Sequence, residues 1–161
     1  MKKIFAVAVL GAIALVGGKA QAQTPNIASH DVTFEVQAIN SITLGSGVSL
    51  TINAAVAGDA PTSVSANSSY AITTNEVGQK VTAEIDADMP TGVTLSVLLA
   101  APTGGAATSQ SLSTGAQDVV TGVSTLNESG LQVHYTLAAI SAAGVVASDS
   151  RTVTYTIIAG S

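Results

Sequence analysis

Three acidic residues, Glu84, Asp86 and Asp88, come closest to forming a ligand site by type and spacing. Residues two apart on a β-strand point to the same face, so the three carboxylates could line up. Calcium binds such oxygens, and weak calcium sites are common outside cells. Each step between same-face residues covers about 7 Å, too far for one ion without loop ligands. The three residues are therefore weak candidates for calcium, and the alternative is a charged strand edge that resists pairing.

The two histidines, His30 and His134, are the candidate general bases. A nucleophilic triad needs a base beside its nucleophile and an acid that orients the base. His30 lies at the start of the first expected strand. His134 lies between Val133 and Tyr135, which places it on the outward face of its strand. No nucleophile or acid has motif spacing around either, so we expect surface histidines, no catalytic residues and a protein that is not an enzyme.

Composition disfavours other chemistries. The chain has no cysteine, so thiol catalysis, thiolate metal sites and disulfides are excluded. Two carboxylates could serve glycoside hydrolysis, but there is no tryptophan, there are few other aromatic side chains to stack on sugars, and no long loops could build a cleft. We expect no cofactor and no metal beyond the weak calcium candidates.

The first 22 residues have the pattern of a secretory signal peptide. Lys2 and Lys3 precede an apolar run, residues 4–16, which is shorter than the roughly 20 residues that span a bilayer. Ala20 and Ala22 are small residues where signal peptidase cleaves, which predicts cleavage before Gln23. We expect a mature bacterial protein that is periplasmic, on the cell surface or secreted, with no membrane span.

Removal of residues 1–22 makes the chain strongly acidic. Three of the five basic residues lie in that segment, which leaves Lys80 and Arg151 against ten acidic residues. The net charge is then about −8 near neutral pH. Such a chain lacks the cations that bind nucleic acid or anionic membranes.

The remainder alternates between apolar and polar residues with a period of two, which indicates half-buried strands. Residues 23–29 are expected to be a flexible leader, and residues 30–161 a single domain. A hairpin connection is expected over 75–79, and a turn over 127–130. Expected strands are centred on 32–38, 48–52, 70–74, 81–85, 93–99, 118–121, 131–137 and 153–157.

This spacing of short strands predicts an all-β fold, an immunoglobulin-like antiparallel β-sandwich of seven to nine strands. A jelly roll or an open barrel is the alternative.

Several stretches resemble a group of small bacterial secreted all-β proteins of unassigned function. They are residues 70–75, 80–86, 89–95, 98–104, 118–122 and 151–156. In its alternating, Thr- and Val-rich strands the chain also resembles pilin-like and coat-type β-sandwich subunits. These resemblances imply a secreted structural protein and no activity.

Two functions remain open from the sequence. The first is a structural or surface protein, such as a fibre, coat or matrix subunit, that assembles through β-strand pairing. Residues 30–38 or 152–158 would then pair with another copy or with another surface protein, whereas ordinary pairing within one chain is the alternative. The second is a monomeric extracellular module that binds a cation, a glycan or a surface protein.

Overall fold

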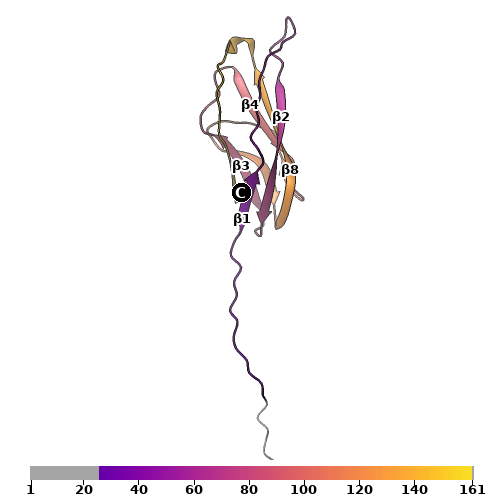
Figure 1. Ribbon diagram of the computed structural model, residues 1–161, viewed down its shortest axis with the longest axis vertical. Helices are drawn as coiled ribbons and strands as arrows, with labels where there is room; N and C mark the ends of the chain where they lie inside the picture. Colours follow the sequence, from indigo (N-terminus) through magenta and orange to yellow (C-terminus); the bar gives the residue numbers. More distant parts are fainter. Residues whose placement is uncertain (1–25, 161) are drawn as a thin grey trace, which may run out of the picture. The chain divides into compact units, whose positions relative to one another are not determined.

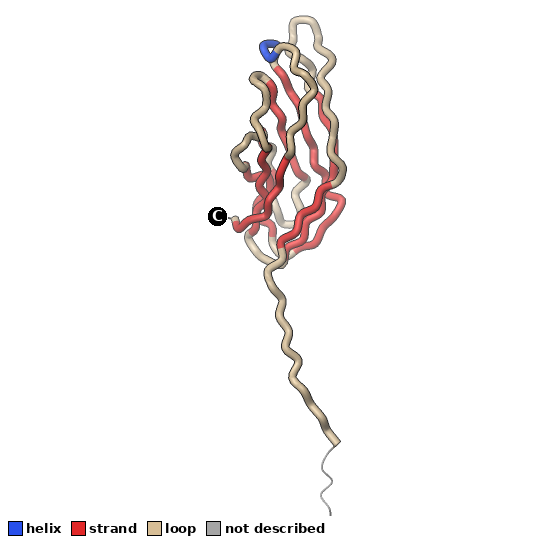
Figure 2. The backbone as a smooth tube through the Cα atoms, turned by 60° about the vertical axis from the view of Figure 1, so that its left-hand side comes forward, coloured by secondary structure: helices blue, strands red, loops and turns tan. Residues whose placement is uncertain are grey.

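The computed structural model describes residues 26–160, so the expected signal peptide and its cleavage site lie outside the described residues. The chain divides into two units after Glu35. In the first unit, residues 26–35 contain no helix or strand and run as an extended trace (Figure 2). The second unit, residues 36–160, contains both sheets and is called the β-sheet unit below.

The β-sheet unit consists of two antiparallel sheets, which confirms the all-β prediction (Figure 1). One sheet has the order β1-β2-β8-β4-β6 and the other the order β5-β7-β3-β9. A single 3-10 turn, Ser141–Ala143, is the only helical element among the described residues. The strands are β1 (Asn40–Leu44), β2 (Val64–Thr74), β3 (Gln79–Ile85), β4 (Val93–Leu99), β5 (Ala106–Ala107), β6 (Gln110–Ser111), β7 (Gln117–Val123), β8 (Leu126–Ala139) and β9 (Val153–Ala159).

The core lies between the two sheets and follows from the alternation of the strands. Alternate residues of a strand face one side, so each sheet contributes its apolar face. The buried apolar residues are Tyr70, Ile72, Leu95, Val97, Leu99, Val133 and Tyr135 from the first sheet, Val81, Ala83, Ile85, Val119, Val120, Val123 and Tyr155 from the second, and Leu112.

Tyrosine hydroxyls complete the core. The hydroxyls of Tyr135 on β8 and Tyr155 on β9 lie 2.8 Å apart and join the two sheets. The hydroxyl of Tyr70 donates to the carbonyl oxygen of Ala100 at 2.6 Å. Among the described residues no buried side-chain polar atom lacks a partner, as expected where unpaired polar groups are costly.

Two expected strands are absent. Residues 32–38 and 48–52 alternate as predicted, but neither segment forms a strand, and the first strand begins only at Asn40. Alternation makes a segment amphipathic, whereas a strand also needs a neighbour that exchanges backbone hydrogen bonds with it. These two predictions were wrong because the sequence pattern does not report on that neighbour.

Two expected connections also differ. The residues between β2 and β3 form no hairpin, because β2 and β3 belong to different sheets and the chain crosses between them there. Residues 127–130 form no turn and lie within β8. There β8 has one residue more than β2, between the pairs Tyr70–Leu131 and Ile72–Glu128. Gly130 has a φ of 72°, which suits a β-bulge and misled the prediction of a turn.

Candidate functional site

An open groove is the main concave feature of the β-sheet unit. Its volume is about 1200 Å³, and it opens between the segment after β1 and the segment before β9. Leu95 on β4 and Tyr135 and Leu137 on β8 line it from the inner face of the first sheet. The groove therefore reaches down to the core.

The first wall of the groove is residues 46–53. Val48, Leu50 and Ile52 are half-buried, whereas Ser49 and Thr51 between them are exposed. Val48 and Leu50 pack against the core. This wall thus has the two-faced character of a strand, with its apolar side inward.

The first wall has free backbone groups. Gly45 N–H donates to Ser69 at 2.7 Å, and Thr62 N–H donates to Ala54 at 2.8 Å. Between these two bonds, residues 46–53 make no backbone-to-backbone hydrogen bond within the described part of the chain. The carbonyl oxygen of Ser46 accepts the Ser68 hydroxyl at 2.7 Å. The remaining N–H and C=O groups form a row like the one that an edge strand presents to an incoming strand.

The second wall is residues 145–152, and Arg151 holds its C-terminal end in place. The Arg151 guanidinium donates from Nε and Nη2 to the carbonyl oxygen of Asp88, at 3.2 and 2.9 Å. It also pairs with Asp149 at 2.6 Å, and this hydrogen bond is the main reason that the pKa of the Asp149 carboxyl is lowered. At the N-terminal end of this wall, Val145 is fully exposed. Residues 145–149 make no backbone-to-backbone hydrogen bond within residues 26–160.

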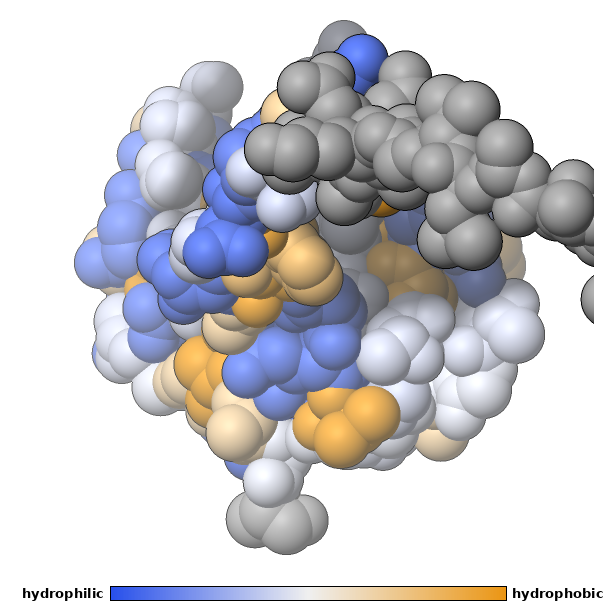
Figure 3. All heavy atoms as spheres, turned by 90° about the horizontal axis from the view of Figure 1, so that it is seen from below, coloured by the Kyte–Doolittle hydropathy of each residue, from blue (hydrophilic) through white to orange (hydrophobic). Residues whose placement is uncertain are grey.

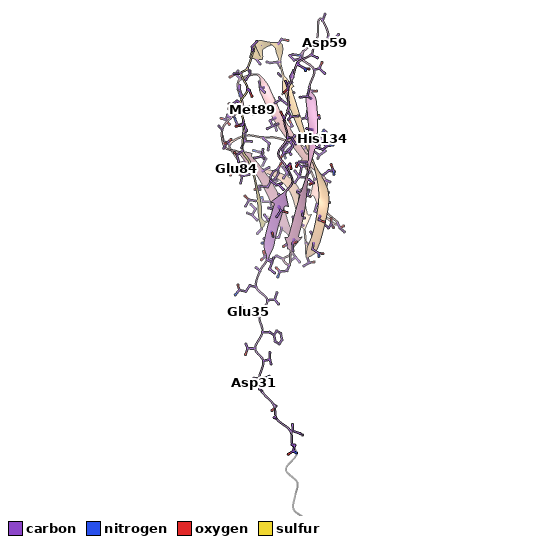
Figure 4. All side chains as sticks on the ribbon, viewed as in Figure 1. Asp31, Glu35, Asp59, Glu84, Met89 and His134 are labelled. Atoms are coloured by element: carbon purple, nitrogen blue, oxygen red, sulfur yellow. The ribbon has the colours of Figure 1, made fainter. Side chains whose placement is uncertain are left out.

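Residues 30–38 carry a second unusual feature, and we call them the donor segment. Val32, Phe34 and Val36 are 71 %, 89 % and 79 % exposed. The residues between them are polar, and Glu35 is one of them (Figure 4). Large apolar side chains at alternate positions of one extended segment form an exposed apolar stripe, which soluble monomers seldom carry.

Exposed apolar residues elsewhere are scattered. Val77 and Ile158 are examples on the β-sheet unit. Seen from below, apolar side chains are interspersed with hydrophilic ones (Figure 3).

The predicted calcium candidates do not come together. Glu84 is half-buried on β3 and pairs in register with Thr154 of β9. Asp86 accepts the N–H of Thr152 at 3.0 Å, and Asp88 accepts the Thr114 hydroxyl at 3.2 Å. Within residues 26–160 no three His, Asp or Glu side chains are grouped so that they could hold a metal ion. Asp86 instead binds the second wall at Thr152, and Asp88 binds a neighbouring loop at Thr114.

Both histidines are exposed, as expected, and His134 lies on the outward face of its strand, but no strand begins at His30. His134 is exposed on β8, and its Nδ1 lies 2.6 Å from the Oδ1 of Asn67 on β2. An amide oxygen can fix the ring, but it is not the acid of a triad. His30 is exposed in the first unit. Figure 4 shows His134 and Glu84 on different sides of the β-sheet unit, on strands of different sheets.

Sequence reasoning missed the groove. The alternation of Val48, Leu50 and Ile52 was visible, but it was assigned to a paired strand. No strand was expected between residues 137 and 153, although Val145 and Val146 lie in the second wall. No family model matches the chain, and no curated protein is significantly similar to it. Among the described residues no helix is long and apolar enough to cross a membrane.

Proposed function

We propose that the protein is a secreted, non-enzymatic structural subunit of an extracellular fibre, coat or matrix, and that its copies assemble through β-strand pairing. The observation that carries this proposal is the exposed alternation of Val32, Phe34 and Val36 on a segment outside both sheets. Burial of each side chain is worth about 1.5–3 kcal/mol, so a partner that covers all three gains substantially. The proposal assigns no catalytic residue.

The strand order supports an immunoglobulin-like arrangement that is one strand short. In such sandwiches the sheets have the orders A-B-E-D and C-F-G. The order β1-β2-β8-β4 corresponds to the first, with β6 added at its edge. The pair β3-β9 corresponds to C and F, with β5 and β7 added beside β3. No strand within residues 26–160 then occupies the place of the last strand, beside β9.

The secreted location rests on the signal-peptide pattern of residues 1–22. The acidic mature chain, with about −8 net charge, suits solubility before assembly. Other copies, or other surface proteins, are the partners that an exposed strand-like segment would take.

The test is the mass distribution of residues 23–161 by size exclusion with light scattering over a concentration series. We expect large species that persist on dilution. The double variant Phe34→Asp/Val36→Asp should remain monomeric, because its apolar face carries two charges.

The matched control is Thr33→Asp/Gln37→Asp, which adds the same charge to the polar face of the same segment. It should assemble like the original protein. A monomer at every concentration of the original chain would contradict the structural-subunit proposal. Equal assembly of both double variants would show that the apolar face plays no part.

A further inference from the structure

We propose that the donor segment of one copy enters the groove of a second copy and becomes the strand that the sandwich lacks. The identity of the partner rests on the proposed function, whereas the groove and its walls are features of the β-sheet unit alone. The donor segment would lie between residues 46–53 and residues 145–152 and continue towards the free edge of β9.

The backbone of the groove is suited to a strand. Both walls lie outside the sheets, and the N–H and C=O groups of 46–53 and 145–149 have no backbone partner within residues 26–160. An inserted strand offers donors and acceptors on both of its edges, so it can pair with either wall. Main-chain pairing of this kind gives affinity that does not depend on a particular side chain.

The side chains are complementary as well. The groove, at about 1200 Å³, exceeds the roughly 300–1,000 Å³ typical of small-molecule pockets, which favours a longer occupant. Eight residues of the first wall extend over about 26 Å at 3.3 Å per residue, and seven residues of the donor segment cover about 23 Å. Val32, Phe34 and Val36 would face Leu95, Tyr135 and Leu137, while Thr33 and Glu35 stay in solvent.

Hydrogen bonds hold the chain at Gln37 and Ile39, at the end of the donor segment and inside the β-sheet unit. Asn75 accepts the N–H of Ile39 at 2.7 Å and donates to the carbonyl oxygen of Gln37 at 2.8 Å. These bonds fix the chain at the start of β1, whereas the groove begins after the end of β1 at Leu44. Return to the same groove would require the chain to reverse between Gln37 and Asn40, where it is already bonded. A second copy has no such restriction.

The contact is head-to-tail, because donor and acceptor are different surfaces of one chain. With such a heterologous interface a dimer still has one free donor segment and one free groove, so further copies can add at either end. The expected product is an open linear polymer.

The absence of cysteine permits a direct test by disulfide trapping. One chain carries Thr33→Cys or Glu35→Cys, and a second chain carries Ser49→Cys or Thr51→Cys. All four positions are exposed and lie beside the apolar contacts. Neighbouring strands bring β-carbons to about 4.5–5.5 Å, from which a small shift reaches disulfide geometry. The four combinations cover the neighbouring registers of the inserted strand.

We expect at least one combination to give a mixed disulfide at tenfold or higher yield over the control. The control acceptor is Ser111→Cys on β6, an exposed position on another sheet edge. An excess of a synthetic peptide of residues 28–38 should suppress the mixed disulfide, and the same peptide with Phe34→Asp should not.

The outcomes separate the two proposals. If the chain assembles but all four combinations give no more product than the Ser111→Cys control, the groove is not the acceptor and this inference is wrong, while the structural-subunit proposal stands. If the original chain is monomeric and unlinked, both fail.

Discussion

At the residue scale, three buried tyrosines place their hydroxyls in the core of the β-sheet unit. Burial raises the pKa of Tyr70 to about 12, with a smaller contribution from the negative charge of Glu128. Burial also raises the pKa of Tyr135. The pKa of Tyr155 is raised by burial first, and then by its contact with Tyr135. Each hydroxyl is therefore held in its neutral form.

These pKa shifts predict the stability at alkaline pH. Each folded-state pKa lies above the unfolded value of 10.0. The contribution of each neutral hydroxyl to the free energy of unfolding is therefore complete below pH 10. As pH rises above 10, the unfolded chain loses these protons first, and the free energy of unfolding falls. For Tyr70 the contribution is lost between pH 10 and about 12.

We expect tyrosinate absorbance to stay absent until the protein unfolds and then to appear in one step with the loss of the β-sheet circular dichroism signal. In concentrated urea the same tyrosines should titrate near pH 10. Smooth titration of the folded protein near pH 10 would contradict the burial of these hydroxyls.

At the scale of elements, the sequence predicted those strands whose alternation coincides with pairing. β3, β4 and β9 fall where the apolar residues of 81–85, 93–99 and 153–157 placed them. Sheet order could not be predicted, because β3 pairs with β7 and β9 far away along the chain. The pattern likewise could not tell that 32–38 and 48–52 have no neighbour.

The β-bulge in β8 can be tested at Gly130. Its φ of 72° lies in the left-handed region, and an added β-carbon would meet no atom within 4 Å. Gly130→Ala should therefore lower the free energy of unfolding by about 1–2 kcal/mol through backbone strain alone. Urea unfolding measures the change.

The matched control is Gly115→Ala. Its φ lies outside the left-handed region and the nearest atom to an added β-carbon is 3.8 Å away, so stability should change little. Equal effects at the two glycines would show that the bulge conformation is not the cause.

At the scale of the whole molecule, assembly must bring together copies that carry about −8 each. The repulsion between them acts over about 30 Å at 0.01 M salt and about 10 Å at 0.1 M. Asp31 and Glu35 add negative charge to the donor segment itself.

We expect assembly to be faster at 150 mM sodium chloride than at 10 mM, by about an order of magnitude in initial rate. Light scattering over time measures it. Slower assembly at the higher salt would show that ionic attraction, rather than burial of apolar residues, drives association.

The candidate site was predictable only in part. The sequence offered residues 30–38 and residues 152–158 as segments for pairing with another copy. The second of these pairs within its own chain, as β9 with β3, whereas Val32, Phe34 and Val36 in the first are exposed. The sequence did not locate the acceptor, since the groove is formed by β4, β8 and two loops that lie more than 90 residues apart in sequence. Glu84, Asp86 and Asp88 looked like a cluster because a strand was assumed to continue past Ile85, where β3 ends.

The pairing of β9 with β3 also sets the order of events in folding. Residues 79–85 find one of their two neighbours only when residues 153–159 arrive, so the second sheet cannot close before nearly the whole chain is available. Contacts of such long sequence separation slow folding. Until residues 153–159 arrive, one edge of β3 has no neighbour, and the chain's own last strand competes with any other strand for that position.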